Sequence, residues 1–131
     1  GAIQDLEVGG KPLCHRLAEQ LAPLAAARCD SNGGSALGIV AGATWPEDAK
    51  ALRAILPSSP FLVPGFGAQG AGPADALAGL QRTDAGWDGG LINSTRGLIF
   101  PKAAASATST ASWRQAIDDA VEDSRTALAS V

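Results

Sequence analysis

The sequence predicts an α/β protein whose parallel sheet is built from strand–helix units. Three short apolar runs, at 37–43, 61–63 and 90–93, lack polar alternation, which is typical of parallel strands buried on both faces. Helical patterns separate these runs, so we expect right-handed crossovers between consecutive strands. The predicted order is one helix followed by three strand–helix units.

An amphipathic pattern predicts the first helix at 11–28, after a loop over 1–10. Its apolar positions follow steps of three and four residues: Leu13, Leu17, Leu21 and Leu24. Pro12 suits the first helical turn, whereas Pro23 is expected to kink the helix or to separate its last turn. The turn-forming cluster DSNGGS, at 30–35, follows the helix.

The first strand, at 37–43, leads into a helix with a recognisable start and end. Thr44 is expected to cap this helix while Glu47 reaches back to it, with Pro46 in the first turn. The helix is predicted to end at about Leu56, because a proline follows.

The later units follow the same rhythm. The second strand, at 61–63, is followed by a glycine-rich loop and by a short predicted helix at 73–82. The third strand, at 90–93, is followed by an Ala/Ser/Thr-rich segment at 103–110, which we expect to be flexible. The last helix is predicted at about 111–129, with Trp113, Ile117, Val121 and Leu128 on one stripe.

Composition restricts the class of protein. The 131 residues suffice for one domain, 1–131, and the 46% hydrophobic and 18% charged residues are typical of a globular chain. A net charge of −3 gives no general reason to bind nucleic acid or an anionic membrane. The sequence has no apolar run of about 18 residues and no secretory signal pattern, so a cytoplasmic location is expected.

The predicted three-stranded parallel sheet does not make a complete fold by itself. Three parallel strands leave two edges with unpaired backbone groups, so these units are expected to be part of a larger closed or doubly wound sheet. The chain contains no methionine and begins with Gly1, which agrees with a processed or partial chain. We therefore expect it to be the C-terminal part of a longer fold.

Two loops carry the most informative chemistry. PGFGAQG (64–70) follows the second strand, and its glycines allow backbone N–H groups to approach an anion, with Gln69 as a neutral donor. NSTRG (93–97) follows the third strand, and Arg96 suits bidentate contact with a phosphate. A phosphate held by the loops after two successive strands is typical of TIM (β/α)8 barrels, usually after strands seven and eight.

Other reactive side chains are expected to have structural roles. Cys14 and Cys29 alone cannot form a metal site and are expected to be small buried hydrophobes, and His15 to be a helix-surface residue. Ser94 has no histidine or acid nearby in the sequence, which argues against a hydrolase triad. The last helix carries an acidic cluster that is expected to be a solvated face: Asp118, Asp119, Glu122 and Asp123. The three tryptophans are expected to be core or interface anchors: Trp45, Trp87 and Trp113.

The motifs together resemble one enzyme family. GIVAGATWPEDAKALR (38–53), PFLVPGFGAQG (60–70) and GGLINSTRGLIF (89–100) closely resemble the C-terminal part of orotidine 5′-phosphate decarboxylases of the bacterial second type. The opening GAIQDLEVGGKPL (1–13) is similar to the segment after the fifth strand of that family. The resemblance covers roughly residues 1–100, and it is specific because the three motifs occur jointly and in order.

The resemblance implies a fold, an activity and a set of binding residues. The family is a TIM barrel that converts orotidine monophosphate to UMP without cofactor or metal, and this chain would supply strands six to eight. By this resemblance Gln69 and Arg96 would contact the substrate phosphate, which also meets the backbone N–H of Thr95. Pro64 would lie near the pyrimidine, and Gly65 and Gly67 would shape the loop. A homodimer, with each active site near the partner, is implied in the same way.

The catalytic set of the family is missing from this chain. The family uses an Asp-x-Lys-x-x-Asp run plus an Asp and a Lys from earlier strands, and here Asp48-Ala49-Lys50 is followed by Arg53 rather than Asp. We interpret Asp48 and Lys50 as solvent-facing helix residues, so the chain alone is expected to be inactive. The N-terminal half of the barrel would then come from another segment or chain.

Two other functions stay open at this point. The chain could be a non-catalytic phosphate-binding or structural half-barrel, which the missing catalytic run favours. A sister decarboxylase or an aldolase acting on another sugar phosphate is a weaker alternative, because the family's pyrimidine contacts come mostly from segments absent here.

Overall fold

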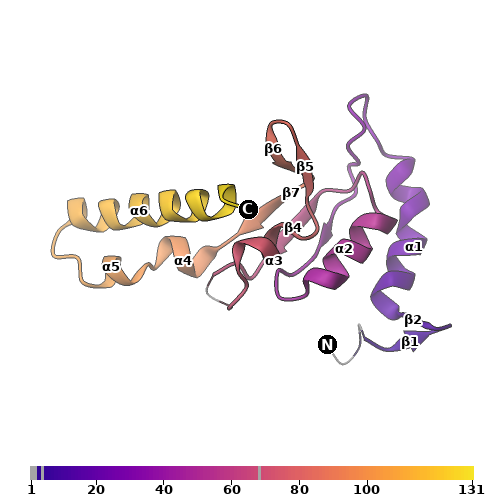
Figure 1. Cartoon of the computed structure of the whole chain (residues 1–131), viewed down its shortest axis with the longest axis horizontal. Helices are drawn as coiled ribbons and strands as arrows, with labels where there is room; N and C mark the ends of the chain where they lie inside the picture. Colours follow the sequence, from indigo (N-terminus) through magenta and orange to yellow (C-terminus); the bar gives the residue numbers. More distant parts are fainter. Residues whose placement is uncertain (1–2, 4, 68) are drawn as a thin grey trace.

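The computed structural model describes residues 3, 5–67 and 69–131 (Figure 1). Ala68, and residues 1, 2 and 4 of the predicted N-terminal loop, lie outside the described residues. Single helices and single strands alternate over residues 13–77. Their bounds are β1 Glu7–Val8, β2 Lys11–Pro12, α1 Leu13–Ala26, β3 Ile39–Val40, α2 Pro46–Ile55, β4 Phe61–Pro64, α3 Pro73–Leu77, β5 Gln81–Thr83, β6 Gly86–Asp88, β7 Gly90–Asn93, α4 Thr95–Ile99, α5 Lys102–Ala105 and α6 Thr110–Ala129.

The central sheet is parallel, as the sequence predicts. Its order is β3-β4-β7, so the three predicted strands lie side by side in chain order. The register pairs Val40 with Leu62, and Leu62 with Leu91. Because all three strands run in one direction, the loops that follow β4 and β7 meet at the same edge of the sheet. In Figure 1 the sheet lies between the α1–α2 pair and the group formed by α4, α5 and α6.

The two faces of this sheet differ sharply. One face carries Phe61 and Val63, which are 1% and 2% exposed and pack in a core rich in alanine. The other face carries Val40, Leu62 and Leu91, which are paired in register yet are 67%, 42% and 74% exposed. The expectation of strands buried on both faces is therefore wrong for this chain, because helices cover only one face. An open apolar inner face is what part of a barrel would present.

Both long helices of the first half form close to where the sequence predicts them, with local differences. α1 continues through Pro23 to Ala26, so the predicted separation of its last turn is not observed. α2 begins at Pro46 without a side-chain cap, so the capping box predicted for Thr44 and Glu47 is wrong. Glu47 instead pairs with Lys50 across one helical turn, at 2.7 Å.

The second half contains elements that apolar patterning did not reveal. The helix predicted at 73–82 ends at Leu77, and the antiparallel hairpin β5–β6 follows it. The loop predicted at NSTRG forms the start of α4, and α5 occupies part of the segment 103–110. The flexibility expected for that segment stays a prediction. α6 agrees closely with the predicted last helix and packs against α3, α4 and α5.

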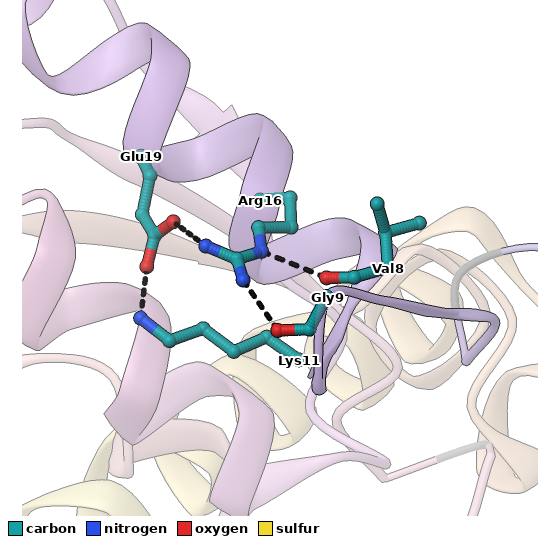
Figure 2. A network of polar contacts seen from close by, with 5 residues as sticks. All are labelled: Val8, Gly9, Lys11, Arg16 and Glu19. Carbon is teal, nitrogen blue, oxygen red and sulfur yellow. Dashed lines mark hydrogen bonds and ion pairs between the residues drawn. The ribbon is translucent and has the colours of Figure 1, made fainter.

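A polar network holds the N-terminal hairpin against α1 (Figure 2). Arg16 donates to the carbonyl oxygens of Val8 and Gly9 at 2.8 and 2.6 Å, and it also pairs with Glu19 at 3.0 Å. Lys11 donates to the other carboxylate oxygen of Glu19. These two cations lower the pKa of the Glu19 carboxyl, Lys11 having the larger effect. The hairpin is thus fixed to the helix by charge rather than by a core of its own.

Arg53 of α2 holds several backbone segments together at the N-terminal ends of the strands. Its guanidinium donates to five backbone carbonyl oxygens, two of them at 2.7 Å beside the strands, on Ser59 and Gly89. The other three belong to Leu56, Pro57 and Gly79. The guanidinium also stacks on the ring of Phe61, 3.8 Å from its centroid. Burial lowers the pKa of Arg53, and nearby Asp88 acts against this shift.

Within the described residues, no helix is long and apolar enough to cross a membrane.

Candidate functional site

A small cavity lies where β4 and β7 end. Its volume is about 80 Å³, several times the roughly 10–15 Å³ that one water molecule needs. Five of the six residues singled out from the sequence line it: Pro64, Gly65, Gln69, Thr95 and Arg96. Two loops that are about 25 residues apart in the chain are therefore brought together, as the parallel order requires.

The loop after β4 turns sharply at glycines. Gly65 and Gly67 have φ of +103° and +73°, a region in which a side chain is strained. A Cβ on Gly65 would lie 3.4 Å from Oε1 of Gln69, so the Gln69 amide folds back over this glycine. Gly67 does not line the cavity. Its N–H donates to the Ala71 carbonyl oxygen at 3.0 Å, which closes the loop on itself.

The loop after β7 is joined to the first loop by Ser94. The Ser94 hydroxyl donates to the carbonyl oxygen of Phe66 at 3.1 Å, across the cavity wall. Thr95 donates to the side-chain oxygen of Asn93, also at 3.1 Å. A Cβ on Gly97 would lie 2.8 Å from the Ser94 hydroxyl oxygen, so a glycine there leaves room for this link.

Arg96 gives the cavity its charge. Among the residues that line it, Arg96 is the one with an ionisable side chain. It is exposed, and within the part of the chain that the structure describes its guanidinium makes no hydrogen bond or ion pair. Thr95 and Arg96 open α4, so their N–H groups have no partner inside that helix. An unpaired guanidinium, an amide and free N–H groups together suit a small anion.

Sequence reasoning missed three lining residues, which are Phe66, Asn93 and Ser94. The sequence offers Ser94 as a candidate nucleophile, whereas in the structure its hydroxyl links the two loops. Its position directly before Thr95 and Arg96 indicates that it lies at the site, but it does not indicate the link to Phe66. Phe66 is 9% exposed and belongs to the hydrophobic core, so it anchors the loop to that core.

The residues with expected structural roles need several corrections. His15 is mostly buried rather than on the surface, its side chain 18% exposed, with Nε2 3.4 Å from a carboxylate oxygen of Asp48. Asp48 is therefore not simply solvent-facing, whereas Lys50 is exposed as expected. Cys29 is exposed rather than buried, because it follows the end of α1.

The aromatic and acidic residues of the second half are simpler. Trp45 and Trp113 are 59% and 44% exposed, so neither is a core anchor in this chain. Trp87 is half-buried beneath Arg82, whose guanidinium carbon lies 5.1 Å from the ring centroid. The acidic residues of α6 are exposed, which confirms the solvated face: Asp118, Asp119, Glu122 and Asp123.

A larger cavity, of about 710 Å³, lies at the opposite end of the strands beside Arg53. The donors of Arg53 are already occupied by backbone carbonyl groups, so this arginine has a structural role. Ligand sites of TIM barrels lie at the C-terminal ends of the strands. For these two reasons the small cavity is the better candidate site.

Comparison with known proteins agrees with this placement. The chain is 42% identical over 100 residues to an orotidine 5′-phosphate decarboxylase of Rhodopirellula baltica, covering 76% of this chain and 32% of the relative. It is 49% identical over 103 residues to the enzyme of the same name from Halorubrum lacusprofundi, covering 75% and 34%. The chain thus spans about a third of the length of these curated relatives. No family model matches the chain.

Solved structures give the same result for the fold. The Leishmania donovani OMP decarboxylase superposes with a TM-score of 0.62 at 33% identity, covering 97% of this chain and 43% of that one. The UMP synthase of the same organism gives a TM-score of 0.62 at 35% identity, covering 97% and 25%.

The fold is therefore an α/β fold that forms part of a TIM barrel, with βα units from its C-terminal part. Within that class, the chain is similar to orotidine 5′-phosphate decarboxylases, which confirms the resemblance that the three motifs indicate.

Proposed function

We propose that this chain supplies the phosphate-binding loops of an orotidine 5′-phosphate decarboxylase, a lyase of pyrimidine synthesis that acts without cofactor or metal. The observation that carries the proposal is the cavity between the ends of β4 and β7, with Arg96 as its charged residue. The similarity to decarboxylases over three quarters of the chain supports it.

The chemistry of the cavity suits a phosphate monoester. In this proposal Arg96 donates two parallel hydrogen bonds to phosphate oxygens, and the Gln69 amide and the Thr95 N–H donate to others. Gly65 and Gly67 hold the first loop in the conformation that brings Gln69 to the cavity. Pro64, at the end of β4, lines the same cavity, and in this proposal it lies near the pyrimidine of the bound nucleotide.

Phosphate binding contributes to catalysis at a distance. The phosphate is remote from the carbon–carbon bond that breaks, so its binding energy helps to hold the reacting ring in an unfavourable environment. Loss of the Arg96 contacts is therefore expected to affect kcat/KM and not only KM. The chain holds three lysines, at 11, 50 and 102, and none lies in an Asp-x-Lys-x-x-Asp run. The proton donor must come from the other part of the barrel.

The open face of the sheet indicates where that other part would lie. Val40, Leu62 and Leu91 form an exposed apolar stripe, which strands of a complete barrel would enclose. The partners we propose are thus the N-terminal half of the barrel, a nucleotide monophosphate substrate and, by resemblance to the family, a second barrel in a homodimer.

The test is the Arg96→Ala variant of the whole barrel that contains this chain. Loss of a bidentate charged contact of about 3–4 kcal/mol predicts a fall in kcat/KM of roughly 100- to 1000-fold for orotidine monophosphate decarboxylation. Arg125→Ala is a matched control, because Arg125 is an exposed arginine of α6 whose one ion pair among the described residues is with Glu122. Unchanged kinetics in Arg96→Ala would refute the assigned role.

The second candidate function is a non-catalytic phosphate-binding half-barrel. The exposed Arg96 at the cavity is equally suited to holding a phosphate without turnover. Decarboxylation by the whole barrel would eliminate it, whereas phosphate binding without any turnover of orotidine monophosphate would support it.

A further inference from the structure

We propose that Cys14, His15 and Asp48 form a binding site for a zinc-type divalent ion. Cys14 and His15 lie in the first turn of α1, and Asp48 lies in the first turn of α2. One ligand atom from each residue lies within 4.8 Å of the others, and all three side chains are partly buried. The site is separate from the phosphate cavity, whose walls come from the loops after β4 and β7.

The distances suit tetrahedral coordination. With metal–ligand bonds of about 2.0–2.3 Å, tetrahedral geometry separates neighbouring ligand atoms by about 3.3–3.8 Å. Nε2 of His15 already lies 3.4 Å from Oδ1 of Asp48. The remaining separations are within 4.8 Å, so side-chain rotations that move the ligand atoms by about an ångström bring all three to a shared ion.

Among residues 3, 5–67 and 69–131, the ligand atoms of the cluster have no stronger partner than one another. Nε2 of His15 is buried and has no hydrogen-bond partner within the described part of the chain. Its distance to Asp48 is that of an ion pair, without hydrogen-bond geometry. A buried imidazole nitrogen that lies beside a carboxylate without a hydrogen bond, in a cluster that also offers a thiol, is the arrangement that metal coordination would satisfy.

The cluster is also accessible. A cavity of about 320 Å³ beside it is lined by Cys14 and Asp48, and by Trp45, which is 59% exposed. Solvent can therefore deliver an ion and supply a water molecule as the fourth ligand. Sites with three protein ligands and one water are typical of zinc.

The ligand set selects the class of ion. A thiolate, an imidazole and a carboxylate suit Zn²⁺ or Co²⁺, whereas Mg²⁺ and Ca²⁺ require oxygen ligands. Binding converts the Cys14 thiol to a thiolate and releases one proton to solvent for each ion bound. Because the ligands come from two helices that pack together, the ion would also join α1 to α2.

The test is a titration of the untagged protein with Co²⁺, followed by displacement with Zn²⁺. We expect a thiolate-to-cobalt charge-transfer band in the near ultraviolet together with tetrahedral bands in the visible range. Cys14→Ser should abolish the charge-transfer band, and Cys29→Ser is the matched control that should retain it, because Cys29 is exposed and outside the cluster.

Asp48→Asn distinguishes a site that requires the folded protein from one formed by Cys14 and His15 alone. Cys14 and His15 are adjacent in the sequence and would bind cobalt weakly even in an unfolded chain, but Asp48 joins them only through the fold. The variant is nearly isosteric at a side chain that is 40% exposed, and we expect it to weaken binding by about tenfold or more. Absence of the band in the unmodified protein, its persistence in Cys14→Ser, or unchanged affinity in Asp48→Asn would each overturn the proposal.

Discussion

Replacing Arg53 by methionine is expected to lower the free energy of unfolding by about 2–4 kcal/mol. Methionine keeps most of the apolar length of the side chain but removes every donor. Five carbonyl oxygens lose a partner, and they are not equivalent. The Gly89 oxygen keeps the N–H of Phe61 at 2.9 Å, and Pro57 is exposed and can bind water instead.

The expected magnitude comes from the carbonyl groups that cannot be rehydrated easily. Ser59 is 1% exposed, and its oxygen accepts from Arg53 at 2.7 Å. Gly79 accepts at the same distance and packs closely against Phe61. Two such groups left without a partner cost about 1–2 kcal/mol each, and the lost stacking on Phe61 adds a smaller amount.

The assay is urea unfolding, followed by circular dichroism, of the unmodified protein and of three variants. Arg53→Lys should give an intermediate loss, because an ammonium has three N–H donors and cannot replace contacts to five carbonyl oxygens. Arg125→Met is the exposed control and should change stability by less than about 0.5 kcal/mol. A loss for Arg53→Met no larger than that of the control would refute the reasoning.

Two further changes test the packing of the sheet and the charge of the N-terminal hairpin. Gly90→Ala places a Cβ 2.4 Å from the carbonyl oxygen of Phe61, which is backbone and cannot move freely, so we expect thermal unfolding to show destabilisation of about 1–3 kcal/mol. Glu19→Gln removes the carboxylate whose pKa is lowered by Lys11 and Arg16. The stability that this carboxylate contributes is present above its unfolded pKa of about 4.3 and is lost as pH falls through the lower folded value. The Tm difference between Glu19→Gln and the unmodified protein should therefore be present at pH 7 and shrink as the pH falls below about 4.3; a difference that stays constant with falling pH would contradict this assignment.

The sequence predicted the sheet well because apolar runs are strong signals. The runs around Val40, Leu62 and Leu91 identified all three parallel strands and their order. Their open inner face was not predicted, because an apolar run has the same sequence pattern whether both faces of the strand are covered or one face is exposed. The hairpin β5–β6 was missed because its strands carry polar residues, and its register depends on a two-residue turn.

The site was predicted better in its residues than in its connections. The glycine-rich loop after the second predicted strand indicated Gly65 and Gln69, and the arginine after the third strand indicated Arg96. The structure places all three on the wall of one cavity. The Ser94 link could not be inferred, because a hydroxyl that donates to a distant carbonyl leaves no pattern in the sequence. The approach of His15 to Asp48 joins two helices 33 residues apart, and no local periodicity reports such a contact.

The most direct test of the central claim is calorimetric titration of the protein with UMP, ribose 5-phosphate and uridine. If the loops after β4 and β7 hold a nucleotide phosphate, UMP should bind and uridine should not, and Arg96→Ala should remove UMP binding. Ribose 5-phosphate should bind more weakly than UMP where the whole barrel supplies contacts to the base. Equal binding of uridine and UMP, or UMP binding that Arg96→Ala leaves unchanged, would contradict the account.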